Sequence, residues 1–320
     1  MSRNPYLFVV GCPRSGTTLL QRMLDHHPLL AVANDSHFIP HVLEEAGETA
    51  SARLTPELVR AVRGYRRFAR LGLSDAVVAD ATVRADSFAS FVSRLYSAYA
   101  GERGKPLGGE KTPDYVKHLP LLHTLFPWAK TLHIVRDGRD VALSTLEWAA
   151  EKGLGRFLLW RTQPVAVCAL FWRQLVATGR RDGWSLGADC YREVRYEQLV
   201  KHPTETISDL LRFVDLRFAR ETVTYYEGKV RRDPGLSAKQ AWLPPTTGLR
   251  DWRREMEPGD VELFEAIAGD LLSSLGYPRA FPTIPEATRQ VAEDCRRRWE
   301  SELAERRARR GRRDGILGRA

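Results

Sequence analysis

The sequence has few cysteines, and their spacing indicates neither a disulfide-stabilised nor a zinc-stabilised protein. Four occur in 320 residues, at Cys12, Cys168, Cys190 and Cys295. No two have C-x-x-C spacing and no histidine follows at zinc-finger distance, so the pattern indicates neither a disulfide framework nor a zinc site. Hydrophobic residues make up 43% of the chain, which excludes a disordered or collagen-like protein and provides for a sizeable core.

Long hydrophobic runs are also missing. No apolar stretch approaches the roughly 20 residues that a membrane-spanning helix needs. The first apolar run, residues 6–10, is too short for a signal peptide and leads directly into a motif that signal cleavage would destroy. We therefore expect a cytoplasmic protein without a transmembrane segment.

Acidic residues are too few to balance the basic ones, and the formal net charge is +9. A surplus of +6 lies in residues 296–320, where ten arginines accompany four acidic residues, so the rest of the chain carries +3. Such a tail attracts anionic polymers. Trp299 is its only aromatic residue, so stacking on bases, and with it specific nucleic-acid binding, is not indicated.

Strand-like and helical patterns alternate along the chain. Residues 6–10 predict a buried strand that ends at Gly11, and a helical pattern follows. Further strands are predicted at residues 131–135 and 190–196, each again followed by a helical pattern. This order predicts an α/β fold, with a P-loop-type parallel sheet flanked by helices on both faces.

The same patterns predict the domain organisation. Residues 1–290 are expected to form a single domain, with a mostly helical insertion near residues 41–105 beside the sheet. Residues 291–320 are charged and rich in helix formers. They predict a solvated helical tail that frays after Gly311.

The loop after the first strand has the outline of a nucleotide phosphate loop. Residues 11–18, GCPRSGTT, fit G-x-x-x-x-G-x-T, but Thr17 replaces the Walker lysine that contacts the β- and γ-phosphates of a nucleoside triphosphate. That replacement argues against ATP or GTP hydrolysis, whereas Arg14 restores a positive charge. Backbone N–H groups of residues 15–18 at a helix N-terminus would cradle an anion. A purely structural turn is the alternative.

A second polar cluster follows the strand at residues 131–135. In VRDGRDVALS, Arg136 ends the strand and Ser144 lies eight residues later, inside the following helix. A guanidinium and a hydroxyl that face one ligand suit a phosphate monoester. The alternative is that Arg136 pairs with Asp137 or Asp140 at the surface.

Three motifs in this order resemble the loops of sulfotransferases that use 3′-phosphoadenosine 5′-phosphosulfate (PAPS). They are CPRSGTT, VRDGRDVALS and VRYEQLVKHP, and the resemblance spans residues 6–277. Residues 13–40 are similar, without a gap, to the tyrosylprotein sulfotransferase segment around its catalytic base. LGYP, at residues 275–278, resembles that family's closing helix. The resemblance implies the sulfotransferase fold.

The resemblance also implies a role for each matched residue. The residues that would bind the 5′-phosphosulfate are Arg14, Ser15, Gly16, Thr17 and Thr18. Arg136 and Ser144 would bind the 3′-phosphate, and Tyr196 would also contact the nucleotide. Lys111 and Ser237 match residues that stabilise the transition state.

The predicted lid departs from the family pattern. Residues 241–252 lack one position of the tyrosylprotein segment, and the lysine that contacts the cofactor in that family is replaced. Arg250 and Arg253 are the candidates to supply its charge.

The catalytic base departs as well, because Asp35 stands where the family has glutamate. Aspartate is one methylene shorter, so its backbone must lie closer to the acceptor and burial must raise its pKa. His37 is the rival base, since a neutral imidazole titrates near working pH. An extended segment would direct both side chains to the same side. A loop or capping role for Asp35 and simple burial of His37 are the alternatives.

The resemblance implies an in-line sulfuryl transfer to a hydroxyl acceptor that needs no metal and leaves adenosine 3′,5′-bisphosphate. The tyrosylprotein segment has basic residues, which serve acidic peptides, where His37 and His41 stand here. Weaker basicity favours a bacterial small-molecule, carbohydrate or lipid hydroxyl as the acceptor. Many relatives of this kind dimerise, so we also expect a homodimer, although no residue pattern identifies an interface.

Two other functions remain open on the sequence alone. A P-loop kinase would need the Walker lysine that Thr17 replaces and an aspartate placed for Mg²⁺. Binding of anionic polymers would rest on RRARRGRR, residues 306–313.

Overall fold

A computed structural model describes residues 3–152, 158–227 and 244–317 of the chain. Backbone contacts divide the chain into two compact units. The sheet unit consists of Met1–Val135 and Thr178–Thr247, and the helical unit consists of Arg136–Ala177 and Gly248–Ala320.

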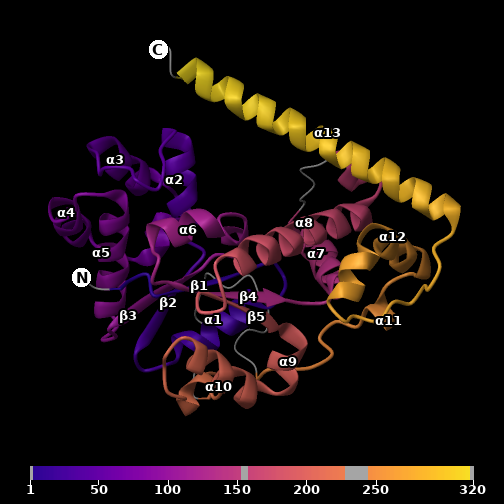
Figure 1. Ribbon diagram of the computed structural model, residues 1–320, viewed down its shortest axis with the longest axis horizontal. Helices are drawn as coiled ribbons and strands as arrows, with labels where there is room; N and C mark the ends of the chain where they lie inside the picture. Colours follow the sequence, from indigo (N-terminus) through magenta and orange to yellow (C-terminus); the bar gives the residue numbers. More distant parts are fainter. Residues whose placement is uncertain (1–2, 153–157, 228–243, 318–320) are drawn as a thin grey trace. The chain divides into compact units, whose positions relative to one another are not determined.

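The sheet unit is built on five parallel strands in the order β2-β3-β1-β4-β5 (Figure 1). The strands are β1 (Leu7–Gly11), β2 (Leu30–Asn34), β3 (Leu107–Lys111), β4 (Lys130–Val135) and β5 (Tyr191–Arg195). The sequence patterns predicted β1, β4 and β5, and these three are confirmed. They did not predict β2 and β3.

Helices make up most of the remaining described chain. Those of the sheet unit are α1 (Thr17–Asp25), α2 (Phe38–Ala46), α3 (Pro56–Gly64), α4 (Asp75–Val83), α5 (Phe88–Gly101), α6 (Leu119–Leu125), α9 (Tyr196–Lys201) and α10 (Pro203–Phe213), with the 3₁₀ turns η1 (Phe68–Leu71), η2 (Pro113–Lys117) and η4 (Arg220–Thr222). Those of the helical unit are α7 (Gly138–Lys152), η3 (Leu158–Arg161), α11 (Trp252–Glu255), α12 (Pro258–Ser274) and α13 (Glu286–Leu317). Residues of α8 (Pro164–Ser185) belong to both units.

Both faces of the sheet are covered, because successive side chains of a strand point to opposite sides. Leu7 and Val9 of β1 are fully buried in a core that also contains apolar side chains of α1 and α10. Phe8, between them, lies on the other face, with its ring centroid 6.2 Å from that of Tyr115 and 5.9 Å from that of Phe126. The predicted parallel sheet with helices on both faces is therefore confirmed.

Side-chain caps explain where several helices of the 41–105 region begin. Thr55 and Ser74 accept hydrogen bonds from backbone N–H groups in the first turns of α3 and α4. Ser87 and Ser90 form a reciprocal capping box at the start of α5. Such caps satisfy N–H groups that have no partner inside the helix. The described elements of this region are helical, apart from an isolated β-bridge between Arg53 and Ser87.

A buried ionic network fixes the start of α7 in the helical unit. The guanidinium of Arg139 is fully buried and donates to the carboxylates of Asp137 and Glu265, at 2.7 and 2.6 Å. It also lies 3.6 Å from the ring centroid of Trp252. Because a buried charge is costly without partners, this network ties α7 to α11 and α12.

The predicted tail differs from the structure in two ways. Helix α13 begins at Glu286 and continues past Gly311, where fraying was expected, to Leu317. Its first turns are also not simply solvated, because Ala292, Cys295 and Trp299 are buried and α13 packs against α12.

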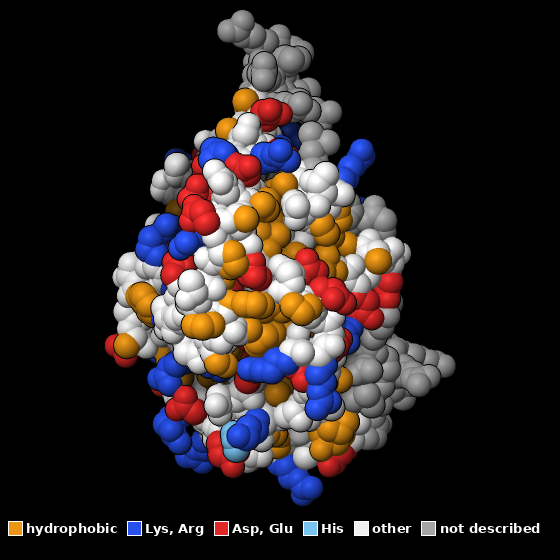
Figure 2. Space-filling model, turned by 90° about the vertical axis from the view of Figure 1, so that its right-hand side faces the viewer, with side chains coloured by type: hydrophobic (Ala, Val, Ile, Leu, Met, Phe, Trp, Pro, Cys, Tyr) orange, Lys and Arg blue, Asp and Glu red, His pale blue; other side chains and the backbone are white. Residues whose placement is uncertain are grey.

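Figure 2 shows Lys and Arg side chains interspersed with Asp and Glu side chains over one face of the molecule. In the part of the chain that the structure describes, no helix has the length and apolar character to cross a bilayer.

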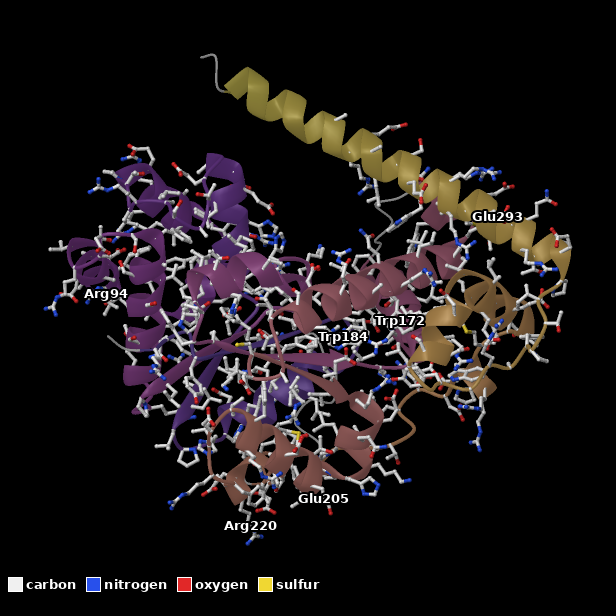
Figure 3. All side chains as sticks on the ribbon, in the orientation of Figure 1. Arg94, Trp172, Trp184, Glu205, Arg220 and Glu293 are labelled. Carbon is white, nitrogen blue, oxygen red and sulfur yellow. The ribbon has the colours of Figure 1, made fainter. Side chains whose placement is uncertain are left out.

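Close packing at the start of α7 generates a stability prediction. Trp172, labelled on α8 in Figure 3, is fully buried, and a Cβ added at Gly138 would lie 2.5 Å from its ring and 2.6 Å from Phe264. Gly138→Ala should therefore lower the free energy of unfolding by about 1–3 kcal/mol, measured by urea denaturation. Gly259→Ala is the matched control, because a Cβ there meets nothing within 4 Å. Equal midpoints for the two variants would contradict this packing.

Candidate active site

The phosphate-loop motif forms a tight connection between β1 and α1. Gly16 has φ +93°, in the left-handed region, and a Cβ there would lie 2.4 Å from the ring of Tyr196. Only glycine fits this position, and the Tyr196 ring lies directly against the loop. Arg14 also adopts a left-handed conformation, with φ 73°, which is uncommon for a residue with a side chain. Two residues expected at the nucleotide, Gly16 and Tyr196, are thus brought together.

The N-terminus of α1 has the properties of an anion cradle. No side chain caps it and no acidic residue lies in its first turn, so the first N–H groups of the helix face outward from its end. Thr17 and Thr18 are nearly buried beside them. Ser15 is fully buried, and its hydroxyl has no hydrogen-bond partner among the described residues. These groups fit a ligand that presents several anionic oxygens.

Strand pairing brings Lys111 and Asp35 together next to this loop. Asn34, the last residue of β2, pairs in register with Lys111, the last residue of β3, and the Asp35 N–H donates to the Lys111 carbonyl at 2.7 Å. The Lys111 side chain is 1% exposed, with Nζ 3.1 Å from Asp35 Oδ1 and 3.5 Å from Thr18 Oγ1. One ammonium therefore contacts both the phosphate loop and the candidate base.

Asp35 and His37 are close together, but the segment that holds them is not extended as expected. Both residues are left-handed, with φ 56° and 59°. His37 Nε2 still lies 3.7 Å from Asp35 Oδ1. Three of the four non-glycine residues with positive φ in the described chain, Arg14, Asp35 and His37, belong to this site. Such local strain is characteristic of functional sites.

The expected rise in the pKa of Asp35 is not found. Burial raises it, but the hydrogen bond from His37 and the charge of Lys111 outweigh burial and lower the pKa of Asp35 to about 2. Burial lowers the pKa of Lys111, and the Asp35 carboxylate opposes that effect. Asp35 is therefore ionised at neutral pH, and its proton affinity is held down by its own neighbours.

Two further charged residues at this site had not been singled out from the sequence. Arg70, in η1, lies 3.7 Å from Asp35 Oδ2 through Nη1. Glu110, next to Lys111, is fully buried and accepts the N–H of Ser36 at 2.9 Å. Glu110 directly precedes Lys111 in the chain, but what indicates its role is its contact with Ser36, a residue 74 positions away.

Aromatic rings continue from His37 away from the phosphate loop. His37 and His41 lie nearly parallel with centroids 6.3 Å apart, and His41 and Tyr65 likewise at 5.9 Å. His118 lies edge-on to His41, with its Nδ1 3.4 Å from a carboxylate oxygen of Glu44. Burial lowers the pKa of His118. The contacts thus run in order from Thr18 through Lys111, Asp35 and His37 to this group of rings.

The other predicted nucleotide ligands belong to the helical unit. Arg136 and Ser144 are both buried. Arg136 lies 3.5 Å from Asp140 Oδ2, one of the two partners considered in the alternative, but this pair is largely buried and not at the surface as that alternative had it. Arg250 forms an ion pair with Glu147, and Arg253 is exposed with its guanidinium 4.4 Å from the Trp252 ring centroid. Ser237 lies outside the described residues.

Comparison with known proteins identifies the family. The model of the sulfotransferase family matches residues 5–220. The chain belongs to the sulfotransferase family. This confirms the resemblance inferred from the three motifs. Enzymes of that family transfer a sulfuryl group from PAPS to a hydroxyl acceptor. The phosphate loop, Asp35, His37, Lys111, Arg136, Ser144 and Tyr196 lie within the matched residues, whereas Ser237, Arg250 and Arg253 lie beyond them.

Curated relatives are similar over most of the sulfotransferase chain. A protein-tyrosine sulfotransferase of Drosophila melanogaster is 28% identical over 287 residues, which cover 87% of this chain and 53% of the relative. Protein-tyrosine sulfotransferase 1 of Homo sapiens is 29% identical over 309 residues, covering 93% and 77%. The chain thus spans about half the length of the Drosophila relative.

Solved structures support the fold. The sulfotransferase domain of the curacin biosynthetic pathway superposes with a TM-score of 0.55 at 21% identity, covering 86% of this chain and 98% of that domain. The sulfotransferase domain of the Synechococcus PCC 7002 olefin synthase gives 0.51 at 24% identity, covering 91% and 94%. Both likenesses concern the fold alone.

The buried Lys111–Asp35 pair generates a prediction for stability against pH. The folded pKa of Asp35, about 2, lies below its usual value of 3.8. Such a carboxylate contributes stability above the higher pKa and loses that contribution as pH falls through the lower one. Asp35→Asn should therefore lower the free energy of unfolding by about 2 kcal/mol at pH 7. The difference from wild type should shrink between about pH 4 and pH 2.

Chemical denaturation at several pH values measures this difference. Asp80→Asn is the control, because Asp80 forms an exposed ion pair with Arg84 at 2.8 Å and should contribute less than about 1 kcal/mol. A deficit of Asp35→Asn that stayed constant down to pH 2 would show that the Asp35 carboxylate is not held ionised by its neighbours.

Proposed function

We propose that this sulfotransferase carries out metal-independent sulfuryl transfer from PAPS to a hydroxyl acceptor, with Asp35 as the catalytic base. The observation that carries the proposal is the placement of Lys111. Its buried ammonium lies 3.1 Å from the Asp35 carboxylate and 3.5 Å from Thr18 of the phosphate loop. A transfer reaction needs the donor site and the proton acceptor side by side, and this contact joins them.

The phosphate loop supplies the donor site in this proposal. When bound, PAPS supplies a sulfuryl group activated by its link to a phosphate. The N–H groups at the start of α1 and the Ser15 hydroxyl would hold the 5′ end, with the Arg14 side chain adding positive charge. Arg136 and Ser144 would hold the 3′-phosphate, and the product would be adenosine 3′,5′-bisphosphate.

Lys111 would change partners when the donor site fills. In the free protein its charge is shared with Asp35 and holds the pKa of that carboxylate low. An anion at the phosphate loop attracts the same ammonium and weakens its contact with Asp35. The pKa of Asp35 then rises, and the carboxylate becomes a better acceptor for the hydroxyl proton. His37, 3.7 Å away, would hold the carboxylate in place.

The acceptor would enter from the side opposite the phosphate loop, because in-line displacement places attacking and leaving oxygens on opposite sides of sulfur. The contacts that lead from the phosphate loop through Lys111 and Asp35 continue beyond the base to the flat rings of His37, His41, His118 and Tyr65, and these would line the acceptor side. Flat imidazole and phenol rings favour stacking against an uncharged skeleton over binding an acidic peptide. We therefore propose a small-molecule, carbohydrate or lipid hydroxyl as the acceptor.

Calorimetry with adenosine 3′,5′-bisphosphate tests the donor site. Wild type should bind it more tightly than ADP or ATP, and Arg136→Ala should weaken binding by about 10- to 100-fold, because a charge-assisted phosphate contact contributes about 1.5–3 kcal/mol. Arg212→Ala, at an arginine that is 79% exposed, is the control and should bind like wild type. Equal or tighter ATP binding would overturn the donor assignment and favour phosphoryl transfer.

Dependence of turnover on pH tests the base. Turnover is followed as sulfuryl transfer from labelled PAPS to a panel of phenols, sugars and lipid alcohols. Asp35→Asn should lower turnover by about 10²–10⁴-fold and leave bisphosphate affinity within a few-fold of wild type. His37→Asn should keep the loss of activity at acid pH that protonation of the Asp35 carboxylate produces. If the loss of turnover at acid pH disappears in His37→Asn but persists in the residual activity of Asp35→Asn, His37 is the base.

A further inference from the structure

The turn formed by residues 35–37, here called the base turn, has an unusual backbone. Asp35 and His37 are both left-handed, and Ser36 between them is fully buried. Residues with side chains rarely occupy this conformation, so the surrounding structure must hold them there. The helix that follows supplies one such contact, since the N–H of Ile39 donates to the Tyr115 hydroxyl at 3.1 Å. The backbone of the base turn itself needs a further contact to hold it in this conformation.

Glu110 supplies that contact. Its side chain is fully buried on β3, and Oε1 accepts the N–H of Ser36 at 2.9 Å and the hydroxyl of Thr112. Oε2 accepts the Tyr96 hydroxyl at 2.8 Å, and Tyr96 in turn lies 3.2 Å from the Ser36 hydroxyl. Burial and the charge of Glu110 raise the pKa of Tyr96 well above its usual value. The Tyr96 hydroxyl therefore stays protonated and donates a hydrogen bond to Glu110.

Glu110 and Lys111 hold the base turn from two sides. They are consecutive in a strand, so their side chains leave it in opposite directions. Glu110 binds the backbone of Ser36, while Lys111 binds the carboxylate of Asp35. Loss of the first contact would leave a buried N–H without an acceptor. Relaxation of Asp35 toward ordinary backbone angles would then turn its carboxylate away from Lys111.

We propose that Glu110 is a positioning residue that keeps the Asp35 carboxylate in its reactive place by binding the Ser36 N–H. The inference rests on the proposed function, in which Asp35 is the base. It predicts that Glu110 acts on turnover and not on donor binding, because its described hydrogen bonds go to Ser36, Tyr96 and Thr112 and not to the phosphate loop.

Three substitutions separate the Ser36 contact from the rest of the network. Glu110→Gln keeps an oxygen for Ser36 and Thr112, and the Tyr96 hydroxyl can rotate to accept from the new amide. Glu110→Leu removes the acceptor. Tyr96→Phe is the matched control, because it removes one donor to Glu110 and leaves the Ser36 contact in place.

Turnover and bisphosphate affinity are measured on all three variants. Glu110→Leu should lower turnover by about 100-fold, the loss typical of a misplaced reacting group, with bisphosphate affinity within about twofold of wild type. Glu110→Gln and Tyr96→Phe should stay within a few-fold in both measurements. Turnover at the wild-type rate in Glu110→Leu would overturn the proposal. Equal losses of turnover and of bisphosphate affinity would also overturn it, because they would indicate general damage to the fold.

Hydrogen exchange of the Ser36 amide gives a readout that needs no acceptor. Its N–H should exchange slowly in wild type, Glu110→Gln and Tyr96→Phe, and fast in Glu110→Leu. Slow exchange in Glu110→Leu would overturn the proposal whatever the activity. If wild type transferred no sulfuryl group to any acceptor, the proposed function would fail, and the exchange rates would still decide whether Glu110 holds the base turn.

Discussion

The buried contact between Lys111 and Asp35 is the interaction on which the candidate site depends. An ammonium that is 1% exposed needs an anionic partner, because burial of an unpaired charge is very costly. Asp35 meets this need in the free protein, and the phosphate loop lies within reach of the same ammonium at Thr18. One charge can therefore stabilise the fold before a ligand arrives and assist the chemistry afterwards.

Two of the three correctly predicted strands, β1 and β4, are almost continuous apolar runs, whereas β5 is only partly buried and β2 was missed although four of its five residues are buried. β1 and β4 carry almost continuous buried side chains, which local patterns reveal. β3 contains Gly108 and Gly109 and resembles a loop, yet a Cβ at Gly108 would lie 2.4 Å from the Tyr96 carbonyl. The glycine is required because α5 packs closely on this strand. That requirement comes from a helix that precedes β3, so the strand's own residues do not reveal it.

The candidate site shows the same division between local and distant information. The phosphate loop was predicted from its own residues, because the strand, the glycine and the helix are neighbours in the chain. The left-handed backbone of Asp35 and His37, by contrast, depends on Glu110, 75 positions after Asp35. The expected rise in the pKa of Asp35 was wrong for a related reason, since burial alone was considered and His37 and Lys111 outweigh it.

The order of Glu110 and Lys111 in β3 also bears on how the sheet assembles. Parallel pairing of Asn34 with Lys111 sets Asp35 beside the ammonium. A slip of one residue between β2 and β3 would exchange the faces of every side chain and could bring the Glu110 carboxylate beside Asp35 in place of the ammonium. Two buried carboxylates repel each other, whereas the observed register forms an ion pair. The sequence Glu-Lys at the end of a short strand thus penalises misaligned pairing during folding.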